Sequence, residues 1–234
     1  MAGEGSRFLK EGWTIPKPLI RLHEKELFLR AIDSISDDEI PMKYSFIVRQ
    51  EHIEKYDIAK EIMAILPDAN IFSVLKTTRG AVETCLIAES VIADDDAVIV
   101  MDCDLEFRSE KFIEIIKSIL VQSMEEANGG VLVSFESNET RYSYAILGED
   151  SYVTRTAEKE VISNHALCGA YFFSTGLRFK QIAHQLLNEP EFGKSEYYVS
   201  LLYNYLLADG EKVRLAPIEE YYSYGTPEEL KRYM

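Results

Sequence analysis

Short apolar segments alternate with stretches of helical periodicity between residues 44 and 135, and this alternation constrains the fold of the 234-residue chain most. The run at 97–101 (AVIVM) is wholly apolar, which is typical of a strand buried on both faces of a parallel sheet. Such a series predicts a mostly parallel, doubly wound α/β sheet. The predicted strands are 44–49, 70–75, 97–101 and 130–135, and the predicted helices are 51–66, 80–92 and 112–120.

The pattern changes after about residue 140, where a mixed, largely antiparallel half is expected. No internal repeat, low-complexity tract or linker divides the sequence, so we expect one domain over 1–234, with a first half at 1–135 and a second at 136–234. The elements predicted for the second half are strands at 141–147, 151–156, 170–174 and 212–218 and helices near 177–187, 195–208 and 227–233.

Charge and cysteine content argue against several classes of function. The chain has 40 Asp and Glu against 25 Lys and Arg, and its formal net charge of −15 repels nucleic acid and anionic lipid. Its longest apolar runs are far too short to span a membrane, and its three scattered cysteines suit a reducing cytoplasm. We therefore expect a cytoplasmic protein without a nucleic-acid or membrane partner, and a homo-oligomer remains open.

The chain opens with the glycine-rich segment MAGEGSRF. Gly3 and Gly5 have no Cβ, so backbone N–H groups there can approach an anion closely, and Arg7 adds a permanent positive charge. In the PKPL segment that follows, a proline on each side fixes the backbone of Lys17. A lysine held in this way can stabilise charge on a phosphoryl oxygen. Each motif alone is also typical of an ordinary turn, but together they favour a phosphate site.

Two aspartates, Asp102 and Asp104, follow the apolar run at its carboxyl end, where open α/β sheets bind their ligands. Residues two apart in an extended chain share a face, and two carboxylates suit Mg²⁺ bound together with a triphosphate. Gly80 begins a predicted helix and would leave N–H donors facing a ligand. An ordinary helix start explains Gly80 equally well.

The segments GEGSRF and PKPL together resemble the N-terminal signature of the sugar-phosphate nucleotidyltransferase superfamily, whose members have a Rossmann-like nucleotide-binding fold. The resemblance implies that Arg7 and Lys17 contact the phosphates of the reaction centre, and that Asp104, with Asp102 beside it, binds Mg²⁺. It makes the first half nucleotide-binding and the second half acceptor-binding. The nucleotide-binding residues that it implies are Ala2, Gly3, Glu4, Gly5, Ser6, Arg79 and Gly80.

The resemblance continues in the second half, through AEK at 157–159 and HALCGAYFF at 165–173. It implies that the phosphorylated acceptor is bound by Glu158, Lys159, Gly169 and Glu196. A surface ion pair between Glu158 and Lys159, worth at most about 1 kcal/mol, and an ordinary helix face around Glu196 are the alternative explanations.

One departure from the family concerns the metal. Ser223 stands where many relatives carry an aspartate as a second ligand, so either Glu219 or Glu220 replaces it or one protein ligand suffices. A subgroup resembling the cytidylyltransferases of capsular and surface-polysaccharide pathways also lacks that aspartate. This favours CTP as the nucleotide, with UTP or dTTP as alternatives, and a role in surface polysaccharide precursor synthesis.

The other departure is at the start, where relatives place a buried strand before the glycine loop and Met1 stands here instead. A parallel sheet without that strand would leave its two neighbours unpaired. We therefore hypothesise that the native protein begins several residues earlier. A comparison of thermal stability between the two lengths tests this, and equal stability would refute it.

The expected reaction is attack by an acceptor phosphate oxygen on the α-phosphorus of an NTP, with pyrophosphate as the leaving group. A strong base is not required, because a phosphate oxygen is already ionised at pH 7. The first rival is a glycosyltransferase of the GT-A class that uses a nucleotide sugar, although such an enzyme does not need the GEGSR and PKP motifs. The second rival is a non-catalytic nucleotide-binding protein.

Overall fold

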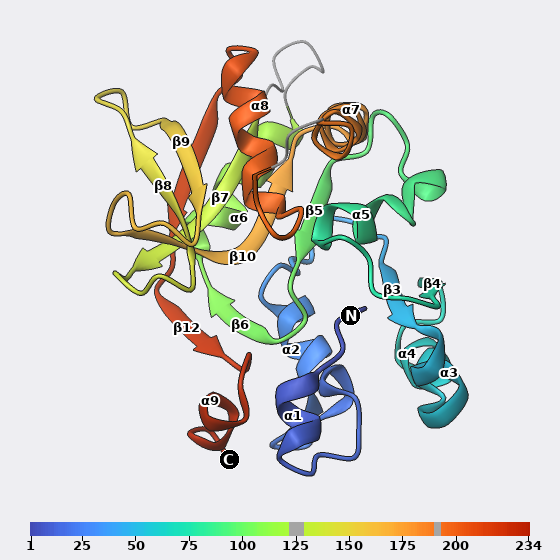
Figure 1. Cartoon of the computed structure of the whole chain (residues 1–234). Helices are drawn as coiled ribbons and strands as arrows, with labels where there is room; N and C mark the ends of the chain where they lie inside the picture. The colour runs from blue at the N-terminus through green and yellow to red at the C-terminus, as the bar shows by residue number, and fades with distance from the viewer. Residues whose placement is uncertain (122–128, 190–192) are drawn as a thin grey trace. The chain divides into compact units, whose positions relative to one another are not determined.

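The computed structural model describes residues 1–121, 129–189 and 193–234 and divides into two compact units (Figure 1). Unit 1 comprises Met1–Thr78, Asp102–Phe107 and Tyr221–Met234, and unit 2 comprises Arg79–Met101 and Arg108–Glu220. The boundaries between the units therefore do not coincide with the expected division at residue 135. The single domain over 1–234 stays a prediction.

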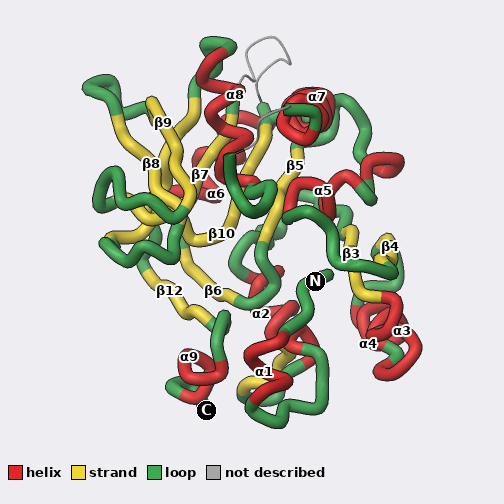
Figure 2. Tube along the Cα trace, in the orientation of Figure 1, coloured by secondary structure: helices red, strands yellow, loops and turns green. Residues whose placement is uncertain are grey.

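A six-stranded mixed sheet forms the centre of unit 2 (Figure 2). The longest strand, β10 (His165–Phe173), pairs antiparallel with β5, β7 and β8, while β8 pairs antiparallel with β9 and β11 pairs parallel with β7. The other five strands are β5 (Val98–Met101), β7 (Gly130–Glu136), β8 (Ser143–Leu147), β9 (Val153–Glu158) and β11 (Val213–Pro217).

Helices cover both faces of this sheet. Successive side chains of a strand point to opposite faces, and most residues of β7 and β10 are buried, so both faces must be covered. Leu132 of β7 belongs to a core cluster with α7 (Gly176–Leu187) and α8 (Leu202–Ala208), whose buried side chains include Phe179 and Tyr203. On the other face lies α6 (Glu110–Leu120), which packs against β7 and β11. The remaining helical elements of unit 2 are α5 (Ala81–Leu86), η2 (Glu89–Val91) and η3 (Val199–Leu201).

Unit 1 contains two apolar clusters. One gathers Phe8, Ile20, Leu27, Tyr224 and Leu230, and the other is centred on Phe28 and the strands and helices of residues 45–66. The elements of this unit are α1 (Ser6–Lys10), η1 (Lys17–Leu19), β1 (Arg21–Leu22), β2 (Lys25–Glu26), α2 (Leu27–Asp33), β3 (Ser45–Arg49), α3 (Gln50–Tyr56), α4 (Ile58–Ile65), β4 (Asn70–Val74) and α9 (Pro227–Lys231), with β6 (Leu105–Arg108) and β12 (Glu220–Ser223) paired at its boundary.

Several predicted elements are confirmed closely, and several helices are shorter than predicted; the helix predicted at 195–208, for example, begins only at η3 and continues as α8. Predicted strands 44–49 and 70–75 are β3 and β4, which pair in parallel. The predicted helix 51–66 is broken into α3 and α4 at Asp57, whose φ is 50°. Aspartate tolerates this left-handed conformation better than most residues, and hydrophobic periodicity does not reveal it. The predicted helix 80–92 ends early, as α5 followed by η2.

The run AVIVM forms β5, but its surroundings differ from the prediction. All four residues of β5 are partly exposed, and in the described ranges its only strand partner is β10, which runs antiparallel to it. The α/β class is confirmed, but the sheets are not mostly parallel. The pairs β3–β4 and β7–β11 are parallel, whereas β1–β2, β5–β10, β7–β10, β8–β10 and β8–β9 are antiparallel. An apolar run indicates a strand and not the direction of its neighbours. Within the described ranges no strand precedes Arg21.

The last helix is capped as its sequence indicates. Thr226 is the N-cap of α9, Pro227 is its first residue, and Thr226 and Glu229 form a reciprocal capping box. None of the helices in the part of the chain that the structure describes has the length and apolar character needed to cross a bilayer.

Candidate functional site

The glycine loop of unit 1 leaves open space around its backbone. A Cβ added at Gly3 or Gly5 would meet no heavy atom within 4 Å, and Gly5 has a φ of 62°, a left-handed conformation that favours glycine. Glu4 is held to one side, because Thr77 Oγ1 donates to its Oε1 at 3.0 Å. Arg7 is exposed in the first turn of α1. The loop can therefore admit a ligand close to its main chain.

Lys17 and Asp104 form a direct ion pair, although 87 residues separate them in the sequence. Pro16 and Pro18 are both buried, so they anchor the short helix η1 and leave Lys17 partly exposed between them. The Lys17 ammonium also lies 5.6 Å from the ring centroid of Phe8. Burial lowers the pKa of Lys17, but the charges of Asp104 and Asp102 contribute to raising it by more, so its net pKa lies above the ordinary value.

The two predicted metal ligands alternate around a partly buried cysteine. Cys103 packs against an apolar cluster of unit 1, Asp102 is exposed, and Asp104 is partly exposed. Both carboxylates lie close enough to Lys17 to act electrostatically on its ammonium group. In the described ranges there is no group of three or more His, Cys, Asp or Glu side chains that could hold a metal ion by itself.

A hydrogen-bonded network is joined to the main chain of Asp104. The backbone N–H of Tyr224 donates to the Asp104 carbonyl at 2.8 Å, and the Tyr224 hydroxyl donates to Glu106 Oε2 at 2.7 Å. Arg30 Nη1 donates to the same Glu106 oxygen at 2.9 Å, and Arg30 Nη2 to the Leu22 carbonyl at 2.6 Å. Burial, together with the hydrogen bond to Glu106, raises the pKa of Tyr224, so its hydroxyl keeps its proton.

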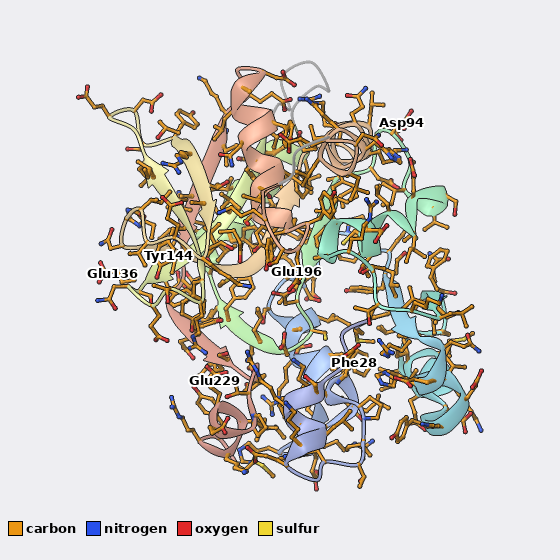
Figure 3. The ribbon with its side chains drawn as sticks, viewed as in Figure 1. Phe28, Asp94, Glu136, Tyr144, Glu196 and Glu229 are labelled. Atoms are coloured by element: carbon orange, nitrogen blue, oxygen red, sulfur yellow. The ribbon has the colours of Figure 1, made fainter. Side chains whose placement is uncertain are left out.

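The residues considered for a second metal ligand have other partners. Glu219 Oε2 accepts from the Glu110 backbone at 3.2 Å, and both Glu219 and Glu220 lie within 4 Å of Arg108. Ser223 donates to Glu229 Oε2 at 3.0 Å, and Glu229, labelled in Figure 3, is the third residue of α9. Neither glutamate of the pair 219–220 is thereby favoured as a replacement for the aspartate that many relatives carry.

Arg79 and Gly80, in unit 2, are bound to the segment that contains Tyr197. The Tyr197 N–H donates to the Arg79 carbonyl at 3.0 Å, and the Arg79 guanidinium lies 5.0 Å from the Tyr197 ring centroid. A Cβ added at Gly80 would come within 2.4 Å of the Tyr197 backbone. Close backbone contact therefore requires glycine at this position, a structural reason that the sequence did not reveal.

Glu158 and Lys159 do not form the surface ion pair considered as an alternative. Glu158 is buried and only 7% exposed, and its Oε2 accepts hydrogen bonds from the hydroxyls of Ser143 and Ser200. Lys159 points elsewhere, because its Nζ donates to the Tyr198 hydroxyl at 2.7 Å. That hydrogen bond raises the pKa of Lys159, and the charges of Glu158 and Glu196 add to the effect.

Lys159 has a φ of 56°, a conformation that costs a residue other than glycine about 1–2 kcal/mol. Strain of this kind is often retained at functional sites. Glu196 is exposed on the segment before η3, where Figure 3 labels it. Gly169, with a φ of 92°, lies at an irregularity in β10 between Leu167 and Tyr171 and is buried, so the strand itself requires glycine there.

The structure thus places the predicted residues in two groups. Unit 1 contains the glycine loop, Lys17 and both aspartates, and unit 2 contains the predicted acceptor-binding residues together with Arg79 and Gly80. The partners that sequence reasoning did not identify are Arg30, Glu106, Ser143, Ser200 and Tyr224. Each is joined to its partner over more than ten residues of sequence, and no local motif marks such a contact.

Solved structures similar to this chain have the same overall fold. A nucleoside-diphosphate-sugar pyrophosphorylase from Vibrio cholerae matches with a TM-score of 0.84 and 25% identity, over 100% of this chain and 97% of that one. A structure from Bacillus anthracis named as a candidate glucose-1-phosphate thymidylyltransferase, in complex with a sucrose, matches with a TM-score of 0.78 and 17% identity, over 99% and 90%. No curated protein matches the chain.

The family model described as nucleotidyl transferase matches residues 1–217, which is most of the sequence. This match includes the glycine loop, Lys17, the two aspartates and the predicted acceptor-binding residues. The chain therefore belongs to the nucleotidyl transferase family and is a nucleotidyltransferase with a Rossmann-like α/β fold.

Proposed function

We propose that the enzyme transfers a nucleoside monophosphate from an NTP to a sugar phosphate or another small phosphorylated acceptor and releases pyrophosphate. The observation that carries the proposal is the direct pair of Lys17 and Asp104, in the same compact unit as the open glycine loop. A permanent cation, a carboxylate and accessible backbone N–H groups are the parts that phosphoryl transfer needs. The similar Vibrio structure is named as a pyrophosphorylase of nucleoside-diphosphate sugars.

In this mechanism the acceptor's phosphate oxygen forms a bond to the α-phosphorus as the bond to pyrophosphate breaks. The backbone of residues 2–6 binds the triphosphate through its N–H groups. Lys17, kept protonated by its acidic neighbours, and Arg7 stabilise negative charge on the α-phosphate and on the leaving group. The chain need not supply a base, because the attacking oxygen is already ionised.

Asp104 and Asp102 fit a bound Mg²⁺ by the chemistry of their donors, which are hard carboxylate oxygens. Mg²⁺ usually binds through one or two carboxylates together with substrate phosphates, so two aspartates without a third protein ligand are a suitable set. The ion would supply charge neutralisation between the phosphates when it is bound.

The nucleotide is proposed to be CTP, with UTP or dTTP as alternatives, and the product to enter surface polysaccharide synthesis in the cytoplasm. Ser223 in place of an aspartate supports this choice, since the cytidylyltransferase-like subgroup shares that feature. Pyrophosphate release should be measured with four NTPs against a panel of sugar phosphates and other phosphorylated small molecules, with Mg²⁺ present. We expect release with CTP to be the fastest. If no combination of NTP and acceptor gives release of pyrophosphate, a non-catalytic nucleotide-binding protein is favoured instead.

Lys159 is proposed to bind the acceptor's phosphate, and two substitutions separate this role from its backbone strain. Both Lys159→Met and Lys159→Gly should raise KM for the acceptor about tenfold, because each removes a charged hydrogen-bond donor. KM for the NTP should be unchanged in both. The glycine variant should be more stable than the methionine variant by about 1 kcal/mol, because glycine relieves the left-handed strain.

Steady-state kinetics and denaturant unfolding of the two Lys159 variants provide the measurements. An unchanged KM for the acceptor in Lys159→Met, or a rise in KM for the NTP alone, would contradict the assignment to the acceptor. Equal stability of the two variants would show that the strain at this position is not relieved by glycine.

A further inference from the structure

The network of Arg30, Glu106 and Tyr224 joins three segments of unit 1 at a single oxygen. Glu106 Oε2 accepts from Arg30 Nη1 at 2.9 Å and from the Tyr224 hydroxyl at 2.7 Å. Arg30 belongs to α2, Glu106 to β6, and Tyr224 follows β12. Glu106 is 76 residues from Arg30 and 118 residues from Tyr224 in the sequence, so the contact fixes the relative positions of distant segments within the unit.

The first arm of this network leads to the segment that carries Lys17. Arg30 Nη2 donates to the carbonyl of Leu22, in the short strand β1 that begins shortly after η1. The segment is fixed again by the backbone hydrogen bond from Leu27 to Ile20, at 3.0 Å. The network therefore restrains the chain on the C-terminal side of Lys17.

The second and third arms lead to Asp104. Glu106 lies two residues beyond Asp104, in strand β6, which begins directly after Asp104, and the Tyr224 backbone donates to the Asp104 carbonyl at 2.8 Å. The same strand is joined to the end of α2, because the Phe107 N–H donates to Ser34 Oγ at 2.9 Å. Tyr224 thus makes two contacts near Asp104. Its backbone N–H binds the Asp104 carbonyl, and its hydroxyl binds Glu106 in the strand that follows Asp104.

The buried charges of this network are better explained by the positioning of nearby groups than by a gain in the stability of the fold. Tyr224 is 1% exposed and the Arg30 side chain 16%, and the Arg30 Nε is buried with no hydrogen-bond partner in the described part of the chain. Partly buried ion pairs are weak evidence for stability, since apolar replacements are often as stable. Reacting groups, in contrast, must be held within about 0.5 Å of the productive geometry by the residues that support them.

We propose that Arg30, Glu106 and Tyr224 are positioning residues that hold Lys17 and Asp104 at the spacing required for nucleotidyl transfer. They contact neither substrate nor metal, and they act through the Leu22 carbonyl and the Asp104 main chain. The proposal rests on the proposed function and adds to it a set of supporting residues outside the predicted site.

The experiment removes one hydroxyl at a time from two adjacent rings. Tyr224→Phe removes the donor to Glu106 but keeps the ring and the backbone bond to Asp104. Tyr233→Phe is the matched control, because its ring packs edge-to-face against Tyr224 at 5.7 Å between centroids. Glu106→Gln, which keeps the side-chain shape and removes the charge, is the second variant. Each is assayed for pyrophosphate release with saturating and limiting NTP and acceptor.

Tyr224→Phe should lower kcat about tenfold and change both KM values by less than about twofold, because a displaced Lys17–Asp104 pair still binds substrates but stabilises the transition state less well. Glu106→Gln should do the same, and Tyr233→Phe should match the wild type. The double variant Tyr224→Phe/Glu106→Gln should be no slower than the slower single variant, because both changes act on the contacts of the same Glu106 oxygen: the first removes its bond from Tyr224 and the second its charged pairing with Arg30.

A fall in thermal stability with an unchanged kcat in both Tyr224→Phe and Glu106→Gln would overturn the proposal and leave the network a structural role. A rise in KM with an unchanged kcat would also overturn it. If the wild type itself releases no pyrophosphate under any condition, the proposed function fails first, and the positioning role falls with it. If the wild type is active and the variants have the wild-type kcat, only the positioning role is contradicted and the proposed function stands.

Discussion

Replacing Lys17 with methionine should lower kcat for pyrophosphate release by about 10²–10³-fold, the usual cost of removing one group that stabilises transition-state charge. Methionine keeps much of the length and the apolar stem of lysine, so the buried prolines on either side can keep their packing. What is lost is the ammonium group that contacts Asp104 and is proposed to face the α-phosphate. KM for the NTP should change less than kcat, because the backbone loop still binds the triphosphate.

Lys10→Met is the matched control for this prediction. Lys10 is an exposed lysine at the end of α1 in the same unit, so its substitution removes one positive charge without touching Asp104. Its kcat should stay within about twofold of the wild type, as expected for a surface substitution away from the reacting groups. Steady-state kinetics on folded samples, checked by circular dichroism, would decide. A Lys17→Met enzyme within about threefold of the wild-type rate would contradict a role for Lys17 in the chemical step.

Replacing Gly3 with alanine should reduce kcat/KM for the NTP by about 100-fold while leaving the folded state almost as stable as the wild type. A Cβ at Gly3 meets no atom of the protein within 4 Å, and its backbone is not in the left-handed region, so the substitution causes no clash. The added methyl group would instead occupy space in which phosphate must approach the backbone N–H groups. A displacement of about 1 Å at a reacting group is enough to cost this factor.

Gly193→Ala serves as the control, because a Cβ there also lies in open space but in unit 2. The Tm of both variants should lie within about 2 °C of the wild-type value. Surface substitutions usually change the free energy of unfolding by less than about 0.5 kcal/mol, which corresponds to a shift of this size. Only Gly3→Ala should lose activity. If Gly3→Ala retains full activity, the glycine loop does not approach the phosphates closely; if both variants lose activity equally, the effect is not specific to the loop.

The parts of the fold that sequence predicted well are those marked by local patterns. Segments 44–49 and 70–75 match β3 and β4 to within a residue because their apolar runs end at turns or polar residues. The capping box at Thr226 can be read from the sequence, because all of its members lie within four residues. The break at Asp57 and the antiparallel pairing of β5 were missed, because neither a single left-handed residue nor a strand direction changes the periodicity.

The same distinction applies to the candidate site. The glycine loop and the lysine between two prolines were recognisable because each is a short, unusual motif, and their resemblance to a family implied that Asp104 binds the metal of the same site. The direct contact between Lys17 and Asp104 was not predicted, because 87 residues separate them in the sequence. The burial of Glu158 by Ser143 and Ser200 was not predictable, because the hydroxyl groups come from 15 residues before it and 42 residues after it. Serine occurs too commonly for such a contact to be inferred without the fold.

The central claim is that Lys17 and Asp104 act as one unit on a single nucleotide. A double-mutant cycle of Lys17→Met and Asp104→Asn, with kcat/KM for pyrophosphate release as the readout, tests it most directly. Because groups that act together lose their function together, the double variant should be at most about tenfold slower than the slower single variant. A loss in the double variant equal to the product of the two single losses would mean that the two residues act independently, and the claim would be wrong.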